Sequence, residues 1–219
     1  MIEAVVFDLD GVLVRTEEIW DEVREALVRE RGGRYDAAAQ RAMMGMSSLE
    51  WSLYMHDELG LQERPEEISA EVVRRMLRRY DERLPLIDGA VEAVERIAAR
   101  WPLAVASSSN RELIDAVLAG SGLARHFRAT VSSEEVPRGK PSPDVYLEAA
   151  RRVGAPAERC AAVEDSHSGI RSAKAAGMVV AAIPNATYAP DEEALAEADA
   201  VLESLAELTP DTLAGAARP

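Results

Sequence analysis

Five short apolar runs, separated by segments with helical patterns, constrain the fold of this chain more than any other feature. The runs are rich in Ala, Val and other apolar residues, and they span residues 4–7, 103–106, 129–131, 161–163 and 179–183. Strands that alternate with helices form βαβ units, in which helices cover both faces of a mostly parallel sheet. The sequence therefore predicts an α/β fold with a doubly wound parallel sheet.

One long segment interrupts this alternation of strands and helices. Residues 16–84 contain helical patterns and no run that reads as a strand, and within them Ser47 with Glu50 forms a capping box before a helical segment. Several helices between the first strand and the next βα unit indicate an insertion. We therefore expect a small all-helical cap domain at 16–84, inserted into a core domain made of residues 1–15 and 85–219.

Helix-start signals follow several of the predicted strands. Ser109 with Glu112 forms a capping box before an apolar helical pattern, and Pro143, preceded by a serine, opens another helix. Ser166 is expected to cap a third helix, which ends at Gly177. These signals support the placement of helices between the strands.

Charge and cysteine usage exclude several function classes. The chain has 39 acidic and 25 basic residues and a net charge of −14, which disfavours nucleic acid and anionic membranes as partners. No apolar run approaches a membrane span, and the N-terminus lacks a signal-peptide pattern. Cys160 is the only cysteine, so no intrachain disulfide can form, and a reducing, cytoplasmic location is expected.

Polar side chains follow four of the predicted strands, at the point where each strand ends. Because the carboxyl ends of parallel strands share one edge of the sheet, and ligands bind in the crevice there, we expect these side chains to converge. Four such runs together favour a functional site over four ordinary polar turns. In chain order they are Asp8 and Asp10, Ser107 to Ser109, Lys140, and Glu164 with Asp165.

The chemistry that these groups suit is phosphoryl transfer. Asp8, Glu164 and Asp165 supply hard oxygen ligands, which favour Mg²⁺ over softer metals. Asp8 can attack phosphorus to give an aspartyl-phosphate. Asp10, two positions on, can protonate the leaving alcohol and then deprotonate water, while its backbone carbonyl still binds the metal. The cation also screens the anionic surface of the chain from an incoming phosphate.

The remaining strand-end groups are candidates for phosphate binding. The hydroxyls of Ser107 and Ser108 can donate to phosphoryl oxygens, and Lys140 can neutralise the charge that develops on them. Pro141 biases Lys140 toward an extended backbone, so we expect a loop, rather than a helix, to place the ammonium group.

Taken in order, these residues resemble the four motifs of the haloacid dehalogenase (HAD) superfamily, subfamily I, with a helical cap after the first motif. The motifs read Asp8-x-Asp10-Gly11, Ser107, Gly139-Lys140-Pro141 and Glu164-Asp165-Ser166. The resemblance extends to about residue 205. It implies a Rossmann-like core, a mobile cap that closes over the substrate, and Mg²⁺ as the cofactor.

The same resemblance assigns roles to individual residues. It implies that Asp8 is the nucleophile and that Asp10 is the general acid and base. It also implies that Asp8, the backbone carbonyl of Asp10 and Asp165 bind the metal, with Glu164 as a further ligand or as a support for the ligands. The serine and the lysine of the second and third motifs would hold the phosphoryl group.

Departures from three related subfamilies select an activity within the superfamily. Dehalogenases of this kind lack an aspartate at the position of Asp10, and phosphonate hydrolases need a cap lysine that this chain does not have. β-Phosphoglucomutases carry a histidine where this chain has Trp20, and a cap-loop arginine where it reads Gly45-Met46-Ser47-Ser48-Leu49. A phosphatase acting on a small phosphorylated metabolite is therefore expected, with a β-phosphoglucomutase-like phosphomutase as the alternative.

A phosphoacceptor signalling module, similar to a response-regulator receiver domain, is a second alternative. Such modules also combine strand-end acids, a hydroxyl and a lysine. The helical insertion and the leaving-group acid Asp10 argue against this alternative. The sequence assigns neither the substrate nor the oligomeric state.

Aromatic and methionine residues of the expected cap allow two interpretations. They can form the wall that faces the substrate, or they can fill the core of the cap, and at helical spacing the second interpretation is preferred. The residues concerned are Trp20, Met43, Met44, Met46 and Trp51.

Overall fold

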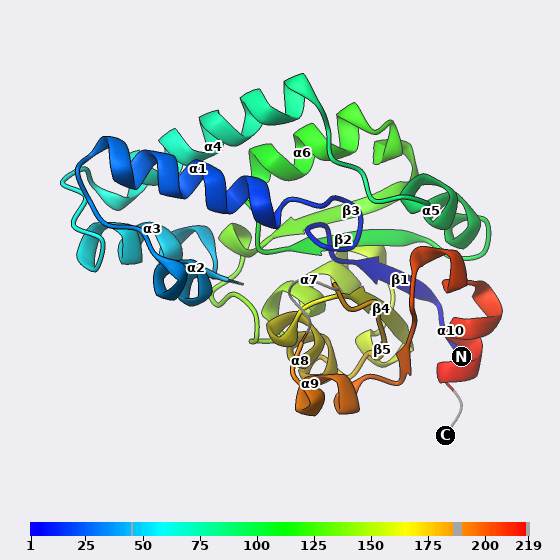
Figure 1. Cartoon of the computed structure of the whole chain (residues 1–219). Coiled ribbons are helices and arrows are strands. Elements are labelled where there is room, and N and C mark those ends of the chain that lie inside the picture. Colours follow the sequence, from blue (N-terminus) through cyan, green and yellow to red (C-terminus); the bar gives the residue numbers. More distant parts are fainter. Residues whose placement is uncertain (45, 186–189, 218–219) are drawn as a thin grey trace.

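The computed structural model describes residues 1–44, 46–185 and 190–217 and has a parallel sheet at its centre (Figure 1). The described strands form one six-stranded sheet in the order β3-β2-β1-β4-β5-β6, and every pair is parallel. The predicted α/β fold is confirmed, and each of the five predicted runs corresponds to a strand, although Ile183 lies just beyond β5. The strands are β1 (Ala4–Phe7), β2 (Leu103–Ser107), β3 (Phe127–Ser132), β4 (Cys160–Glu164), β5 (Val179–Ala182) and β6 (Ala200–Val201). The two-residue β6 was not predicted, since so short an edge strand carries no pattern.

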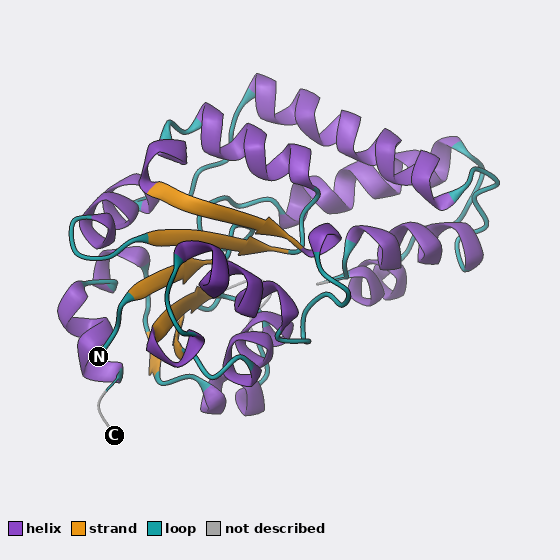
Figure 2. Cartoon of the chain, turned by 180° about the vertical axis from the view of Figure 1, so that it is seen from behind, coloured by secondary structure: helices purple, strands orange, loops and turns teal. Residues whose placement is uncertain are grey.

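Helices cover both faces of the sheet (Figure 2). Successive residues of the central strands belong to the two different apolar clusters beneath these helices. Val5 and Phe7 pack with α5 (Ala90–Ala98), α6 (Arg111–Gly120) and α10 (Pro210–Ala216). Ala4 and Val6 pack on the other face with α7 (Asp144–Val153) and α8 (His167–Ala175), beside the short α9 (Glu192–Glu197). A sheet covered on both faces explains why the central strands β1 and β2 are buried along their whole length.

Residues 17–82 form the predicted helical insertion. Its helices are α1 (Glu17–Glu30), α2 (Ala37–Met43), α3 (Ser48–Asp57) and α4 (Pro65–Glu82). α1 and α4 lie side by side (Figure 1), and ion pairs join them on the outside: Arg75 with Glu30 at 2.6 Å and Arg79 with Glu22 at 2.8 Å. Since α4 also packs on α6, the apolar cluster on that face of the sheet continues into the insertion.

The helix starts agree with the sequence in part. Ser47 and Glu50 form the predicted capping box of α3, and Ser166 caps α8 by accepting from the backbone N–H of Gly169. The prediction for Ser109 was wrong, because α6 starts after Asn110 without a side-chain cap. The Ser109 hydroxyl is instead engaged by Asp10, at 2.6 Å.

In the described part of the chain, no helix combines the length and the apolar character that crossing a membrane requires.

Candidate active site

The candidate site lies where the strand order reverses. From β1 the chain adds β2 and β3 on one side and then β4, β5 and β6 on the other, so β1 and β4 flank the switch point. Ligands of doubly wound sheets bind outside the carboxyl ends of the strands at such a point. Asp8 directly follows β1, and Glu164 ends β4 with Asp165 next to it. The topology therefore brings the acids of the first and fourth motifs together.

Lys140 joins these acids from the loop that precedes α7. Its Nζ donates to Asp8 Oδ1 at 2.8 Å and to Glu164 Oε1 at 2.6 Å, and its side chain is only 3% exposed. The negative charges of both partners hold the Lys140 pKa above its ordinary value, although burial acts in the opposite direction. The loop thus places a permanent cation at the centre of the acidic cluster, as predicted for this position.

Asp8, Glu164 and Asp165 fit a divalent cation. One carboxylate oxygen from each lies within 4.8 Å of the others, and all three residues are buried. Burial, aided by the negative charge of Glu164, raises the pKa of Asp8 to about 8 against the pull of Lys140, and it raises that of Asp165 well above its usual range. Deprotonation of all three carboxyl groups beside one ammonium would leave an excess of negative charge, which a divalent cation would compensate. An oxygen-only set of this kind suits Mg²⁺.

Both oxygens of Glu164 already have partners in the protein. Oε1 accepts from Lys140 Nζ and from the hydroxyl of Tyr146 at 2.7 Å. Oε2 accepts from the backbone N–H of Asp165 at 3.0 Å and from both the N–H and the hydroxyl of Ser166. Burial favours the neutral acid, but the charge and hydrogen bond of Lys140 keep the Glu164 pKa below its ordinary value.

Two glycines allow the backbone to approach this cluster. Gly11 has a φ of +80°, and a Cβ there would lie 1.9 Å from Asp165 Oδ2. Gly169, in the first turn of α8, would bring a Cβ to 1.8 Å from Glu164 Oε1. A larger residue at either position has to displace a carboxylate of the site.

The Asp10 carboxylate lies in a separate hydrogen-bond environment. Oδ1 accepts from the hydroxyl of Thr16 at 2.5 Å and from Trp20 Nε1 at 3.4 Å. Oδ2 accepts from the hydroxyls of Ser109 at 2.6 Å and Ser107 at 3.3 Å. Four donors, two from the end of β2 and two from the start of the insertion, therefore fix an acid that is not part of the Asp8 cluster.

The serines of the second motif differ in exposure. Ser107 is fully buried, and its hydroxyl also accepts from the backbone N–H of Ser109 at 3.0 Å. Ser108 and Ser109 line the cavity at the sheet edge, whereas Ser107 lies behind it. The structure thus brings all the predicted site residues to one place, with Ser107 and Glu164 in its supporting layer. Phosphate binding by Ser107 and Ser108 stays a prediction.

The opposite wall of this cavity comes from the insertion. The preferred cap-core role is confirmed for Met43 and Trp51, which are 1% exposed and belong to the buried apolar cluster. Both side chains also line the cavity, so the two interpretations hold together. The wall residues are Trp20, Met43, Met44, Met46 and Trp51. Gly45, the first residue of the cap loop that we compared with mutases, lies outside the described residues.

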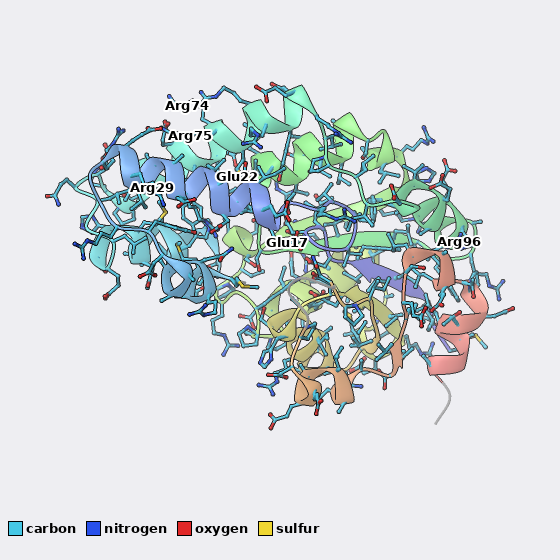
Figure 3. The ribbon with its side chains drawn as sticks, viewed as in Figure 1. Glu17, Glu22, Arg29, Arg74, Arg75 and Arg96 are labelled. Atoms are coloured by element: carbon cyan, nitrogen blue, oxygen red, sulfur yellow. The ribbon has the colours of Figure 1, made fainter. Side chains whose placement is uncertain are left out.

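Sequence reasoning missed several residues that contact or line the site. Thr16 carried no signal, and Ser109, although it was expected to converge on the sheet edge with Ser107, was assigned no role beyond a helix cap. Tyr146 was hidden in a helical pattern. Arg24 of α1 lines the cavity and is 9% exposed, whereas a cap cation was sought only in the loop at 45–49. The inner end of α1, where Glu17 is labelled in Figure 3, points toward the carboxyl edge of the sheet.

Comparisons with known proteins agree with this geometry. A profile described as haloacid dehalogenase-like hydrolase matches residues 2–177. Hexitol phosphatase B of Escherichia coli strain K12 is 31% identical over 221 residues, which cover 98% of this chain and 97% of the relative. Fructose-1-phosphate phosphatase YqaB of the same strain is 32% identical over 177 residues, which cover 80% of this chain and 92% of the relative.

The solved structures that resemble this fold include CbbY from Rhodobacter sphaeroides in complex with phosphate. It has a TM-score of 0.85 and 27% sequence identity, and the alignment covers 98% of this chain and 100% of that chain. The family match spans most of the chain and contains all the strand-end motifs. The chain therefore belongs to the haloacid dehalogenase-like hydrolases.

Proposed function

We propose that this protein is a Mg²⁺-dependent phosphatase that hydrolyses a small phosphorylated metabolite, of the phosphosugar or phosphoglycolate type, through an aspartyl-phosphate on Asp8. The observation that carries the proposal is the separation of two acids that are two residues apart in the chain. Asp8 is paired with Lys140, whereas Asp10 is held by four hydroxyl and indole donors. A nucleophile and an acid/base need such different environments.

In the first step, an Asp8 carboxylate oxygen forms a bond to phosphorus as the bond from phosphorus to the ester oxygen breaks. The leaving alkoxide takes a proton from Asp10 and departs as the alcohol. Lys140 stabilises the negative charge beside Asp8. In the second step, Asp10 removes a proton from water as the water oxygen attacks phosphorus, and Asp8 is released together with inorganic phosphate.

Asp8, Asp165 and the backbone carbonyl of Asp10 would hold Mg²⁺, which supplies positive charge to the phosphoryl oxygens when it is bound. The five hydrogen bonds accepted by Glu164 support a positioning role, in which Glu164 orients Lys140 and the start of α8. Ser108 would donate to the phosphoryl group, and Ser107 would do so once a substrate draws its hydroxyl from Asp10.

The phosphatase names of the relatives support hydrolysis over phosphoryl transfer between sugar oxygens. By resemblance, Trp20 stands where β-phosphoglucomutases carry a histidine. Its indole N–H donates to Asp10. The buried, unpaired Cys160 supports the proposal of a reducing, cytoplasmic location.

The test is release of inorganic phosphate from a panel of sugar, glycolate and nucleoside phosphates, with Mg²⁺ or with a chelator. We expect turnover with Mg²⁺ only, and a loss of about 10³-fold or more in Asp8→Asn. Asp211→Asn, which changes an exposed carboxylate of α10, is the matched control and should retain activity. Full activity in Asp8→Asn would discard the mechanism. If β-glucose 1-phosphate is isomerised faster than it is hydrolysed, the protein is a phosphomutase. If the protein is phosphorylated once, in a labile form, and does not turn over, it is a signalling module.

A further inference from the structure

Arg24 is a buried cation in the wall of the active-site cavity. It lies on the inner face of α1 and is 9% exposed. It lines the same cavity as Asp8, Asp10 and Lys140, on the side formed by the insertion. Arginine is almost never buried to this extent unless a partner compensates its charge. The partner of Arg24 therefore decides what its position means.

No carboxylate of the described residues forms an ion pair with Arg24. Nε of Arg24 is buried without a hydrogen-bond acceptor, and no ion pair of the described residues includes this side chain. Asp21 is the nearest candidate on the same helix, but its carboxylate accepts from the hydroxyl of Tyr35 at 2.6 Å. The donors of Arg24 thus stay available to a group from outside the described chain.

Two tryptophans lie against the guanidinium. Its central carbon lies 4.6 Å from the ring centroid of Trp20 and 4.9 Å from that of Trp51. Such rings stabilise the cation through their faces, while the N–H donors of a guanidinium lie in its own plane. The arrangement orients the donors before a ligand arrives, which lowers the entropy that binding costs.

We infer that Arg24 binds a second anionic group of the substrate, a carboxylate or a phosphate, at the end remote from the phosphate that is cleaved. The inference rests on the proposed function and narrows its substrate class to phosphate esters that carry two anionic groups. A planar fork of N–H donors matches either oxyanion. Burial lowers the pKa of Arg24 to about 10, which leaves the guanidinium charged at neutral pH.

The charges around Arg24 agree with a ligand rather than an internal ion pair. Asp10, Asp21 and the phenol of Tyr35 are the groups that act on it, and both carboxylates accept hydrogen bonds from other donors. The remaining wall is mainly Trp and Met, which offers no competing cation. A neutral sugar end would leave the charge of Arg24 buried and unpaired, whereas an oxyanion would compensate it.

The experiment compares matched substrates that differ only in the remote group. One pair is 2-phosphoglycolate and ethylene glycol monophosphate, and the other is fructose 1,6-bisphosphate and fructose 1-phosphate. The ratio of kcat/KM within each pair is measured with Mg²⁺ for the wild type, Arg24→Met and Arg24→Lys. We expect the wild type to prefer the member with the second anionic group in at least one pair. Arg24→Met should lower the kcat/KM ratio of that pair by about 30-fold. The pair that responds distinguishes a carboxylate from a second phosphate.

Arg29→Met is the matched control, because Arg29 lies on the same helix with its side chain 67% exposed. It should leave both ratios unchanged. Arg24→Lys retains the charge without the planar fork and should lower the responsive ratio by less than Arg24→Met, about 3- to 10-fold. It also provides the test if Arg24→Met does not fold.

A purely structural role of Arg24 predicts a different result. Wild-type ratios near one in both pairs, or ratios within twofold of the wild type in Arg24→Met and Arg24→Lys, overturn the inference and leave the proposed phosphatase intact. If the wild type releases no phosphate from these or any other panel ester, the proposed function fails, and this inference fails with it.

Discussion

The two walls of the active-site cavity are built in opposite ways. At the sheet edge, Lys140 and Glu164 are buried charged groups whose hydrogen-bonding atoms are engaged by other residues. On the side of the insertion, Trp and Met residues surround Arg24, whose Nε has no hydrogen-bond partner among the described residues. A saturated network holds reacting groups within narrow limits. The apolar wall of the insertion has an unpaired donor, Arg24 Nε, that can bind a polar group of the ligand.

This difference suggests a division of labour. Rigid positioning is needed where bonds to phosphorus form and break, since small displacements there cost large factors in rate. Substrate choice needs a surface that can vary without disturbing the acids. The insertion offers such a surface because, among its described residues, it contributes only Trp20 and the adjoining Thr16 to the partners of Asp10. Division of the chain into a core domain and a mobile cap stays a prediction.

The largest effect is expected from removing the cation of the sheet-edge wall. Lys140→Met leaves Asp8 and Glu164 buried without their common partner, so the free energy of unfolding should fall by about 3–5 kcal/mol. Phosphate release should fall by about 10³-fold or more. Urea denaturation and the phosphate assay measure the two effects.

Lys174→Met is the matched control, because Lys174 is the chain's only other lysine and its ion pair with Asp199 is partly exposed. It should lower the free energy of unfolding by less than about 1 kcal/mol.

Arg24→Met tests the other wall. Its lost cation–π contacts are offset by removal of an unpaired buried donor, so the free energy of unfolding should change by no more than about 1 kcal/mol. A loss as large as that of Lys140→Met would break the contrast between the walls.

A smaller effect is expected from crowding the support of the sheet-edge wall. Gly169→Ala brings a Cβ into Glu164, so either the carboxylate or α8 has to move. We expect a loss of about 1–3 kcal/mol in stability and of about 10- to 100-fold in kcat. Gly215→Ala in α10 has open space around it and should instead stabilise the protein by up to about 1 kcal/mol. Thermal denaturation that ranks the two variants equally would contradict the crowding.

The pH dependence of stability should also distinguish the walls. A carboxyl whose pKa is raised on folding stabilises the folded state while it is protonated. For Asp8 this contribution is complete below the ordinary value of 3.8 and is lost as pH rises through about 8. In chelator, the free energy of unfolding should therefore fall with pH by up to about 1.4 kcal/mol per pH unit for each such group.

Added Mg²⁺ should reduce this slope, since a bound cation compensates the deprotonated acids. Calorimetric scans between pH 5 and 8.5, with chelator or Mg²⁺, measure it. Arg24→Met should leave the slope as it is, because its cation belongs to the other wall. Equal slopes with and without Mg²⁺ would argue against a metal at Asp8 and Asp165.

The smallest effect is expected where the walls are joined. Glu134 accepts from the hydroxyl of Ser48 in the insertion at 2.9 Å and from Asn110 at the start of α6 at 2.8 Å. Glu134→Ala should cost no more than about 1 kcal/mol in stability, and KM should rise about threefold as the insertion is held less firmly. Glu66→Ala, an exposed position on α4, is the control. A change in kcat with KM unaltered would contradict this role.

Local patterns were sufficient to predict the architecture and the acidic site. All five apolar runs are strands, because residues buried on both faces of a parallel sheet have to be apolar wherever the chain crosses it. The motif residues converge because every strand of such a sheet ends at the same edge. Both rules depend on the order of residues along the chain, and both can be applied without knowing any long-range contact.

Tertiary packing alone decided which hydrogen-bond donors meet which acceptors. Ser109 looked like a helix cap, yet its hydroxyl serves Asp10, 99 residues away. Arg24 looked like one more charge on a helical pattern, yet α1 turns it between Trp20 and Trp51 into the cavity. The sequence by itself determined which groups reach the sheet edge, since that follows from topology. Which donor meets which acceptor, and which donor is left for a ligand, was set by how α1 packs over the sheet, since partners so distant in the chain have no local pattern.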